Sequence, residues 1–248
     1  MIPLTFCHFK NLPIFDQLQM EEAILRAGSG NWCIINEGSP KAIVMGISGK
    51  PEELIESQEL VNNPMPVIRR FSGGGTVVVE ENTLFVTFIL SKEHFDLGTC
   101  PKRLLDWTGL IYHELFSHTA FQIRENDYAI GDKKIGGNAQ YFAKDRYLHH
   151  TSFLWDFCPK MMQVLKMPPK MPEYRSNREH EAFLTKLMHH FESKEQFIKG
   201  LKTALEKHFI IQPYCEKSVR ALLDAPHRKA LTYVSLGCSS DDLMGRNC

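Results

Sequence analysis

The chain has 248 residues, 43% hydrophobic and 23% charged, and its Lys plus Arg and its Asp plus Glu both number 29. This composition is typical of a globular protein with a substantial core, and the zero formal charge argues against a protein that binds nucleic acid or membrane through its overall charge. Seven scattered cysteines with no C-x-x-C pair predict reduced thiols in a cytosol-like, cytoplasmic compartment, and no apolar run approaches the roughly 18 residues that cross a bilayer.

Helical and strand patterns alternate in the first third of the chain. Apolar spacing predicts an amphipathic helix over 15–27, and Pro51 followed by two glutamates predicts a second helix over 51–60. Runs of β-branched and aromatic residues predict strands at 32–35, 42–47, 67–68, 76–79 and 83–90. We expect the first two strands to pair through the turn at 37–40, and the last two through the turn at 80–82.

The remainder of the chain continues this alternation. Strands are predicted at 121–123, 128–130, 133–142 and 148–157, and helices at 101–118, 184–191, 194–209 and 216–230. The Met- and Pro-rich segment 158–180 is expected to be a mobile surface excursion, because its prolines oppose continuous helix or strand. The polar tail from Cys238 is expected to fray. Hairpins with inserted helices predict one α+β domain over 1–248, built on a largely antiparallel mixed sheet with flanking helices.

The chain is organised around a loop that runs from Arg69 through Ser72 and three successive glycines to Thr76. Glycines let backbone N–H groups approach a ligand closely and allow positive φ. A neighbouring arginine suits a carboxylate or phosphate, because its guanidinium donates hydrogen bonds in pairs. Taken alone, the loop is equally consistent with a glycine-rich hairpin that carries solvated arginines.

A second motif decides between these interpretations. It runs from Gly131 through Lys134-Ile135-Gly136-Gly137-Asn138-Ala139, and His149-His150-Thr151-Ser152 follows it. Together with Asn126-Asp127, the order and spacing over about residues 15–160 resemble the lipoate–protein ligase A family. That family reads R-R-x-S-G-G-G-A-V, then N-D, then K-[IV]-[SGA]-G-[SN]-A, and finally H-H-G-T-L-L.

The resemblance implies a fold like that of biotin ligases and class II aminoacyl-tRNA synthetases, and a two-step reaction. ATP, with Mg²⁺, would activate lipoate or octanoate as an acyl-adenylate, and the acyl group would pass to a carrier lysine. The implied carriers are the lipoyl domains of 2-oxoacid dehydrogenase E2 subunits and the glycine cleavage H protein. We expect a monomer without the family's additional small C-terminal domain, for which a separate accessory protein would substitute.

Lys134 occupies the family's lysine position, where its ammonium would neutralise charge on phosphate or acyl oxygens. Strand alternation sends its neighbour Lys133 to the opposite face. Asn126 and Asp127 would orient the adenylate or hold magnesium, although an Asn-Asp pair also caps turns. The resemblance implies as substrate- and ATP-binding residues Arg70, Ser72, Gly73, Gly74, Gly75, Val77, Asn126, Asp127, Ile135, Gly136, Gly137, Asn138, Ala139, His149 and Thr151.

The consecutive histidines point to opposite faces of a strand, and we expect His149 or Thr151 to face the pocket. No metal site is expected there, because neighbouring strand residues cannot share one ion. Val77 would wall the acyl tail, or is plain core. The chain has Val79-Glu80-Glu81-Asn82 where the family often has His-Asp-x-Gly-Asn, so the preferred acyl chain stays open.

Two alternatives remain. An ATP-independent octanoyl- or lipoyl-transferase on the same fold would need a cysteine nucleophile, but 121–132 contains none and Cys158 reads as structural. A non-catalytic carrier-binding relative is the second alternative, against which Lys134 and the glycine loop argue. The Gly-Arg-Gly-Arg-x-Gly-Arg loop of biotin ligases is missing from the sequence.

Overall fold

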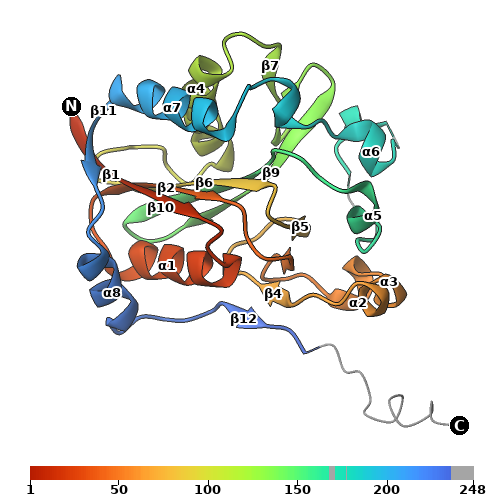
Figure 1. Ribbon diagram of the computed structural model, residues 1–248. Helices are drawn as coiled ribbons and strands as arrows, with labels where there is room; N and C mark the ends of the chain where they lie inside the picture. Colours follow the sequence, from red (N-terminus) through yellow and green to blue (C-terminus); the bar gives the residue numbers. More distant parts are fainter. Residues whose placement is uncertain (168–170, 177, 236–248) are drawn as a thin grey trace, which may run out of the picture.

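A mixed sheet of eight strands forms the centre of the protein, seen in a computed structural model that describes residues 1–167, 171–176 and 178–235 (Figure 1). Its strands lie in the order β11 (Phe209–Pro213), β1 (Ile2–Lys10), β2 (Asn31–Glu37), β6 (Thr83–Ser91), β10 (Arg146–Leu154), β9 (Lys133–Phe142), β8 (Asp127–Ile130) and β7 (Phe121–Arg124). The pairs β11–β1 and β1–β2 are parallel, and the other pairs are antiparallel. Antiparallel pairing therefore dominates, as predicted.

A smaller sheet of four strands carries the glycine-rich loop. Its order is β12 (Thr232–Tyr233), β4 (Val67–Arg69), β3 (Ala42–Met45) and β5 (Val77–Val79). Strand β3 pairs in parallel with β4 and antiparallel with β5. Because the loop joins β4 to β5, it crosses the end of the strand that lies between them.

Helices cover both faces of the large sheet. The amphipathic helices α4 (Pro101–Leu115) and α7 (Lys194–Glu206) lie on one face, and α1 (Ile14–Ala27) with α8 (Glu216–Asp224) lies on the other (Figure 1). Each layer buries its own apolar cluster against the strands. Ser193 caps α7 as predicted, because its side chain accepts a hydrogen bond from the Gln196 amide. The predicted α+β class with flanking helices is confirmed.

Neither of the two expected hairpins in the first third of the chain forms. Strand β2 pairs in the large sheet and β3 in the small one, and β5 and β6 are separated in the same way. The two turns instead pack together: the Gly38 amide donates to the Thr83 carbonyl (2.9 Å), and the Ser39 amide donates to the Glu80 carbonyl (3.3 Å). Both connections therefore cross between the sheets at one corner. Residue-by-residue strand propensity carries no information about which sheet a strand joins.

Three other expected elements differ in the structure. The helix predicted at 51–60 is split into α2 (Pro51–Leu54) and α3 (Ser57–Asn62), because buried Ile55 pairs with Leu165 in an isolated bridge. The segment predicted as a surface excursion holds the short helices α5 (Pro159–Met162) and η1 (Glu173–Arg175). The helix predicted at 184–191 gives way to α6 (His180–Phe183) and η2 (Leu187–His189).

The described part of segment 158–180 contributes to the core. Met161, Met162 and Val164 are buried in a third apolar cluster, which also contains Ile55 and strands of the small sheet. The prediction of an exposed excursion was therefore wrong for these residues. The tail from Cys238 lies outside the described residues. Within the described ranges, no helix has both the length and the apolar character that crossing a membrane requires.

Candidate active site

The Arg70 side chain holds the glycine-rich loop through hydrogen bonds. Its Nη2 donates to the Gly73 carbonyl (2.7 Å), its Nε to Ser72 Oγ (3.0 Å) and its Nη1 to the Val44 carbonyl (3.3 Å). The side chain is buried, and this burial lowers its pKa to about 10, so the guanidinium stays charged near neutral pH. The structure brings Arg70 to the loop as expected, but its donors point into the protein, where they bind the loop itself and β3.

Gly74 is where the loop meets the second motif. Its φ of +99° suits glycine, and a Cβ built there would lie 2.8 Å from Arg70 Nη2 and 3.2 Å from the Ala139 Cβ. Gly73 and Gly75 have no atom within 4 Å of a built Cβ. Because Gly74 and Gly75 are solvent-exposed, their backbone is accessible to a ligand. Two motifs that are far apart in the chain therefore form one surface.

A β-bulge at Ile135 determines which way Lys134 points. Tyr128 of β8 pairs with Gly136 of β9, whereas the next residue, Ala129, pairs with Lys134, so Ile135 has no partner across the strand. One extra residue in a ladder shifts the alternation of side chains. Ile135 itself is fully buried in the cluster beneath α4 and α7.

The bulge places Lys134 on the face of the sheet that meets the loop. Uninterrupted alternation would put Lys134 on the same face as Gly136 and Asn138. With one residue inserted, it shares a face with Gly137 and Ala139. Ala139 lies against the loop, and a Cβ built at Gly137 would lie 3.4 Å from Val77, which places this face toward β5.

Lys134 is paired on this face with the acidic residue of the Asn-Asp motif. Its Nζ lies 2.7 Å from Asp127 Oδ1, and the lysine side chain is 23% exposed. Lys133 is exposed, as expected for the opposite face. The other carboxylate oxygen, Oδ2, accepts a hydrogen bond from the Tyr174 hydroxyl at 2.9 Å. Burial and the Asp127 charge raise the pKa of Tyr174, so the phenol remains a donor.

These contacts bear on magnesium, for which the resemblance implied a role. Mg²⁺ prefers oxygen ligands, and both oxygens of the Asp127 carboxylate already hold Lys134 and Tyr174. Across the described ranges, no group of three or more His, Cys, Asp or Glu side chains could hold a metal ion. The residues present therefore do not fit a magnesium ion held by the protein itself, and we derive no step through one.

The two consecutive histidines lie on opposite faces, but the one that reaches the loop is His150. Its Nε2 lies 3.0 Å from Ser72 Oγ. His149 is fully buried on the other face, where its Nε2 lies 2.9 Å from the Tyr128 hydroxyl. Burial lowers the pKa of His149 to about 3. Thr151 is also buried there, so the expectation that His149 or Thr151 faces the loop was wrong in direction.

The comparisons with known proteins agree with the motifs. The family model described as the lipoyl protein ligase A/B catalytic domain matches residues 13–210. The chain belongs to this family. A Plasmodium falciparum protein named inactive lipoate–protein ligase 2 is 28% identical over 241 residues, which cover 73% of this chain and 62% of that protein. The chain spans 34–44% of the length of seven other curated lipoate–protein ligases.

Solved lipoate–protein ligases have the same fold. The bipartite lipoate protein ligase of Thermoplasma acidophilum, studied with its E2 lipoyl domain, superposes with a TM-score of 0.73 at 18% identity and covers 90% of this chain and 93% of its own. A lipoate–protein ligase A bound with ATP gives a TM-score of 0.72 at 18% identity, with 90% and 94% coverage. At this level of identity, the likeness establishes the fold.

The remaining motif residues of this family member have structural neighbours of their own. Asn138 Nδ2 donates to the Asn126 carbonyl at 2.6 Å, which ties the two motifs together. A Cβ built at Gly136 would lie 2.6 Å from the Ser152 carbonyl oxygen, so β9 and β10 approach closely only because this residue is glycine. The motif residues on the face that meets the loop are Arg70, Ser72, Gly73, Gly74, Gly75, Val77, Asp127, Lys134, Gly137 and Ala139.

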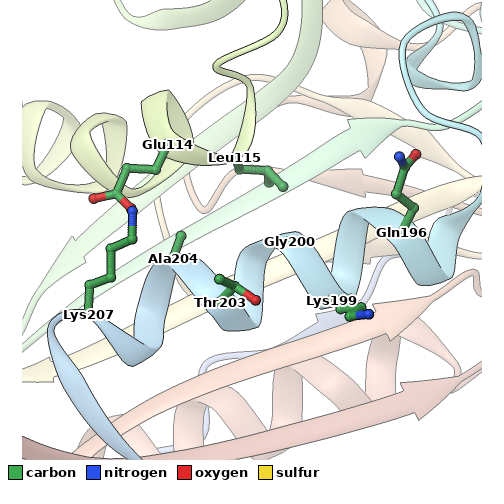
Figure 2. A pocket seen from close by; sticks show the side chains of 8 residues that line it. All are labelled: Glu114, Leu115, Gln196, Lys199, Gly200, Thr203, Ala204 and Lys207. Atoms are coloured by element: carbon green, nitrogen blue, oxygen red, sulfur yellow. The ribbon is translucent and has the colours of Figure 1, made fainter.

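Two concavities help to delimit the site. A pocket of about 340 Å³ lies between α4 and α7, and the ion pair of Glu114 and Lys207 (2.7 Å) lies in it (Figure 2). It is on the face of the sheet away from the loop. A second hollow, of about 500 Å³, is lined by Arg124 of β7 and by Tyr174, which contacts Asp127. Of these two, the second adjoins the Lys134 pair.

Sequence reasoning missed two residues that contact the site. Tyr174 lies in the Met- and Pro-rich segment predicted to be a surface excursion, and no sequence signal points to it. Glu21 is fully buried in α1, and its Oε2 lies 2.9 Å from His150 Nδ1. A buried acid could have been suspected from its helix position, because Leu18 and Leu25 flank it on the apolar stripe.

Proposed function

We propose that this protein is an ATP-dependent lipoate–protein ligase that activates lipoate or octanoate and transfers the acyl group to a lysine of lipoyl carrier domains. The observation that carries the proposal is the arrangement of one half-buried ammonium, Lys134, on the same face as an exposed glycine backbone at Gly74 and Gly75. Membership of the lipoyl protein ligase A/B family supports it. The ATP-bound relative supports the use of ATP.

In the first step, a carboxylate oxygen of the fatty acid attacks the α-phosphorus of ATP, and the bond from that phosphorus to the pyrophosphate oxygen breaks. Negative charge gathers on the phosphate oxygens, where fixed cations and N–H donors stabilise it. Lys134 would supply the cation. Asp127 holds the ammonium in place before substrate arrives, so little side-chain ordering is left for the reaction itself.

In the second step, the carrier lysine's neutral amine attacks the acyl carbon, the bond to AMP breaks, and the amine loses a proton. Lys134 would then act on the acyl oxygen or the leaving phosphate. The glycine loop would contribute backbone N–H groups, because Gly74 and Gly75 present no side chain between backbone and ligand. Arg70 would act indirectly, since its donors hold the Gly73 carbonyl of the loop and the Val44 carbonyl of β3.

We further propose lipoyl domains of 2-oxoacid dehydrogenase E2 subunits and the glycine cleavage H protein as the carriers. The Thermoplasma acidophilum relative, studied with its E2 lipoyl domain, supports a carrier of this kind. That relative is also described as bipartite, which supports a separate accessory protein for this chain. An assay that supplies lipoate and octanoate separately measures the acyl preference.

A non-catalytic relative is the second candidate, and two observations favour it. The Plasmodium falciparum relative is named as inactive. Arg70 also directs its donors inward, away from any substrate phosphate. A cysteine-dependent transferase has less support, because Cys7 and Cys33 are buried and burial raises the pKa of both thiols. The exposed Cys158 has a backbone contact to Glu80.

Mass spectrometry of an apo lipoyl domain tests these candidates directly. The domain is incubated with the full chain and lipoate or octanoate, with and without ATP. The ligase proposal expects acyl addition only with ATP, and loss of that addition in Lys134→Ala but not in Lys133→Ala. In a second incubation without ATP, an acylated carrier replaces the free acid as the donor, and acyl addition there would favour the transferase. If no acyl group is added under either condition although calorimetry detects ATP binding, the result would favour the non-catalytic relative.

A further inference from the structure

A buried chain of hydrogen bonds runs from helix α1 to the glycine loop. Glu21 of α1 is fully buried, and its Oε1 accepts hydrogen bonds from Gln17 Nε2 (2.8 Å) and Thr87 Oγ1 (2.6 Å). Its Oε2 lies 2.9 Å from Nδ1 of His150 on β10. The other ring nitrogen of His150, Nε2, lies 3.0 Å from Ser72 Oγ. The carboxylate is thus connected to the loop through one imidazole.

The direction of each hydrogen bond in this series follows from which groups can donate and which can accept. A carboxylate only accepts, so Nδ1 of His150 donates to Glu21. In a neutral ring, Nε2 then accepts the Ser72 hydroxyl proton. Ser72 Oγ also receives a hydrogen bond from Arg70 Nε at 3.0 Å. Each group therefore has a defined partner on both sides, which fixes the ring's orientation and the hydroxyl's direction.

We propose that His150, held by Glu21, is a positioning residue that keeps the glycine loop in its binding shape through Ser72. This inference rests on the proposed function of the loop as the substrate-binding surface. The Ser72 carbonyl accepts from the Ile47 amide (3.0 Å), and the Arg70 amide donates to the Met45 carbonyl (2.9 Å). The loop backbone is thus held by β3 and by Ile47 just after it, and the Ser72 side chain is held by β10.

The same three groups resemble the carboxylate–imidazole–hydroxyl arrangement that activates a serine nucleophile. Two observations favour positioning over nucleophilic attack. Ser72 is fully buried, so its Oγ has no path to a substrate carbonyl. Its oxygen also accepts the Arg70 N–H, which withdraws electron density from the lone pair that would attack. His150 therefore acts on the loop rather than on reacting atoms.

The test uses the full chain and begins with amide hydrogen exchange, which needs no substrate. In His150→Leu, we expect the Ile47 amide to exchange roughly tenfold faster, because its acceptor Ser72 loses a tether. His150→Gln keeps a donor and an acceptor and should restore slow exchange. Glu21→Gln leaves one donor of the hydrogen-bond series without an acceptor, so it should also speed exchange at the Ile47 amide.

Glu22→Gln is the matched control. Glu22 lies beside Glu21 on α1 and is also buried, but its carboxylate accepts from the backbone amides of Ala230 and Leu231. Glu22→Gln should speed hydrogen exchange at the Ala230 amide and leave exchange at the Ile47 amide unchanged. His150→Leu should speed exchange at the Ile47 amide and leave exchange at the Ala230 amide unchanged. If both variants accelerated the two amides equally, the effect would be general loss of stability and the proposal would be overturned.

Kinetics supply the functional arm. We expect His150→Leu to raise KM for ATP roughly tenfold in ATP–pyrophosphate exchange, with kcat changed about threefold or less and with recovery in His150→Gln. A loss confined to kcat would overturn positioning. If the wild-type chain showed no exchange at all, the proposed function would fail, while the amide measurements would still decide whether His150 holds the loop.

Discussion

Lys134 Nζ and Asp127 Oδ1 lie 2.7 Å apart on the sheet face that meets the glycine loop. The lysine side chain is 23% exposed, so its ammonium is held in place yet reachable from solvent. Partial burial strengthens the attraction between such a charge and an anion, because less water screens it than around a fully solvated charge. The first prediction concerns this group.

Replacing Lys134 with alanine should slow adenylate formation by roughly 100-fold or more, by analogy with removal of one oxyanion donor. Lys133→Ala is the control, because Lys133 is exposed on the opposite face and should keep nearly wild-type rates. ATP–pyrophosphate exchange measures the step. Equal rates in the two variants would remove Lys134 from its assigned role.

Two neighbouring glycines should respond differently to the same substitution. Gly74→Ala forces a side chain into a backbone with φ of +99°, against Arg70 and Ala139. Left-handed backbone alone costs an alanine about 1–2 kcal/mol. Gly75→Ala meets open space and should alter the free energy of unfolding little. Urea unfolding checks both variants, and equal losses of unfolding free energy in the two would contradict the described loop shape.

The Tyr174 hydroxyl should matter for binding more than for chemistry. Tyr174→Phe keeps the ring over which the Arg124 guanidinium lies at 4.8 Å but removes the hydrogen bond to Asp127. Asp127 would then bear a less neutralised charge close to an anionic substrate. We expect KM for ATP to rise by about three- to tenfold with a smaller change in kcat. Tyr233→Phe, at an exposed position, is the control.

The buried side chain of His149 should make the free energy of unfolding depend on pH. Burial lowers its folded pKa to about 3, while the unfolded pKa stays near 6.5. The unfolded chain therefore binds the extra proton between these values, so this contribution is complete above about pH 6.5 and is lost as pH falls toward 3. At pH 5 the loss should be about 2 kcal/mol. Urea unfolding at pH 7.5 and pH 5 should show it in wild type and much less in His149→Gln.

Strand periodicity predicted much of this site. It placed Lys133 and Lys134, and also His149 and His150, on opposite faces, and the structure agrees in both cases. It could not say which histidine meets the loop, because that depends on which sheet face the loop covers. Which face of a strand meets another segment depends on the tertiary structure. The expected hairpin partners of β2 and β6 were β3 and β5, and both belong to the smaller sheet.

Other parts of the site depend on contacts between distant segments of the chain. Glu21 lies on an amphipathic helix, where a glutamate is normally read as part of the solvated face. Its burial depends on Thr87 and His150, which are distant in sequence. Tyr174 reaches Asp127 only because its segment returns to pack beside β8. Contacts of this kind are decided by long-range packing, which pattern reading along one chain does not capture.

The unpaired residue Ile135 lets Lys134 and Gly136 lie on opposite faces of the sheet although one residue separates them. Deleting Ile135 would make Lys134 and Gly136 consecutive, and ordinary strand alternation would keep them on the same opposite faces. What the deletion would remove is a fully buried side chain from the apolar cluster beneath α4 and α7. Loss of this residue should therefore lower the free energy of unfolding without turning the ammonium of Lys134 away from the glycine loop.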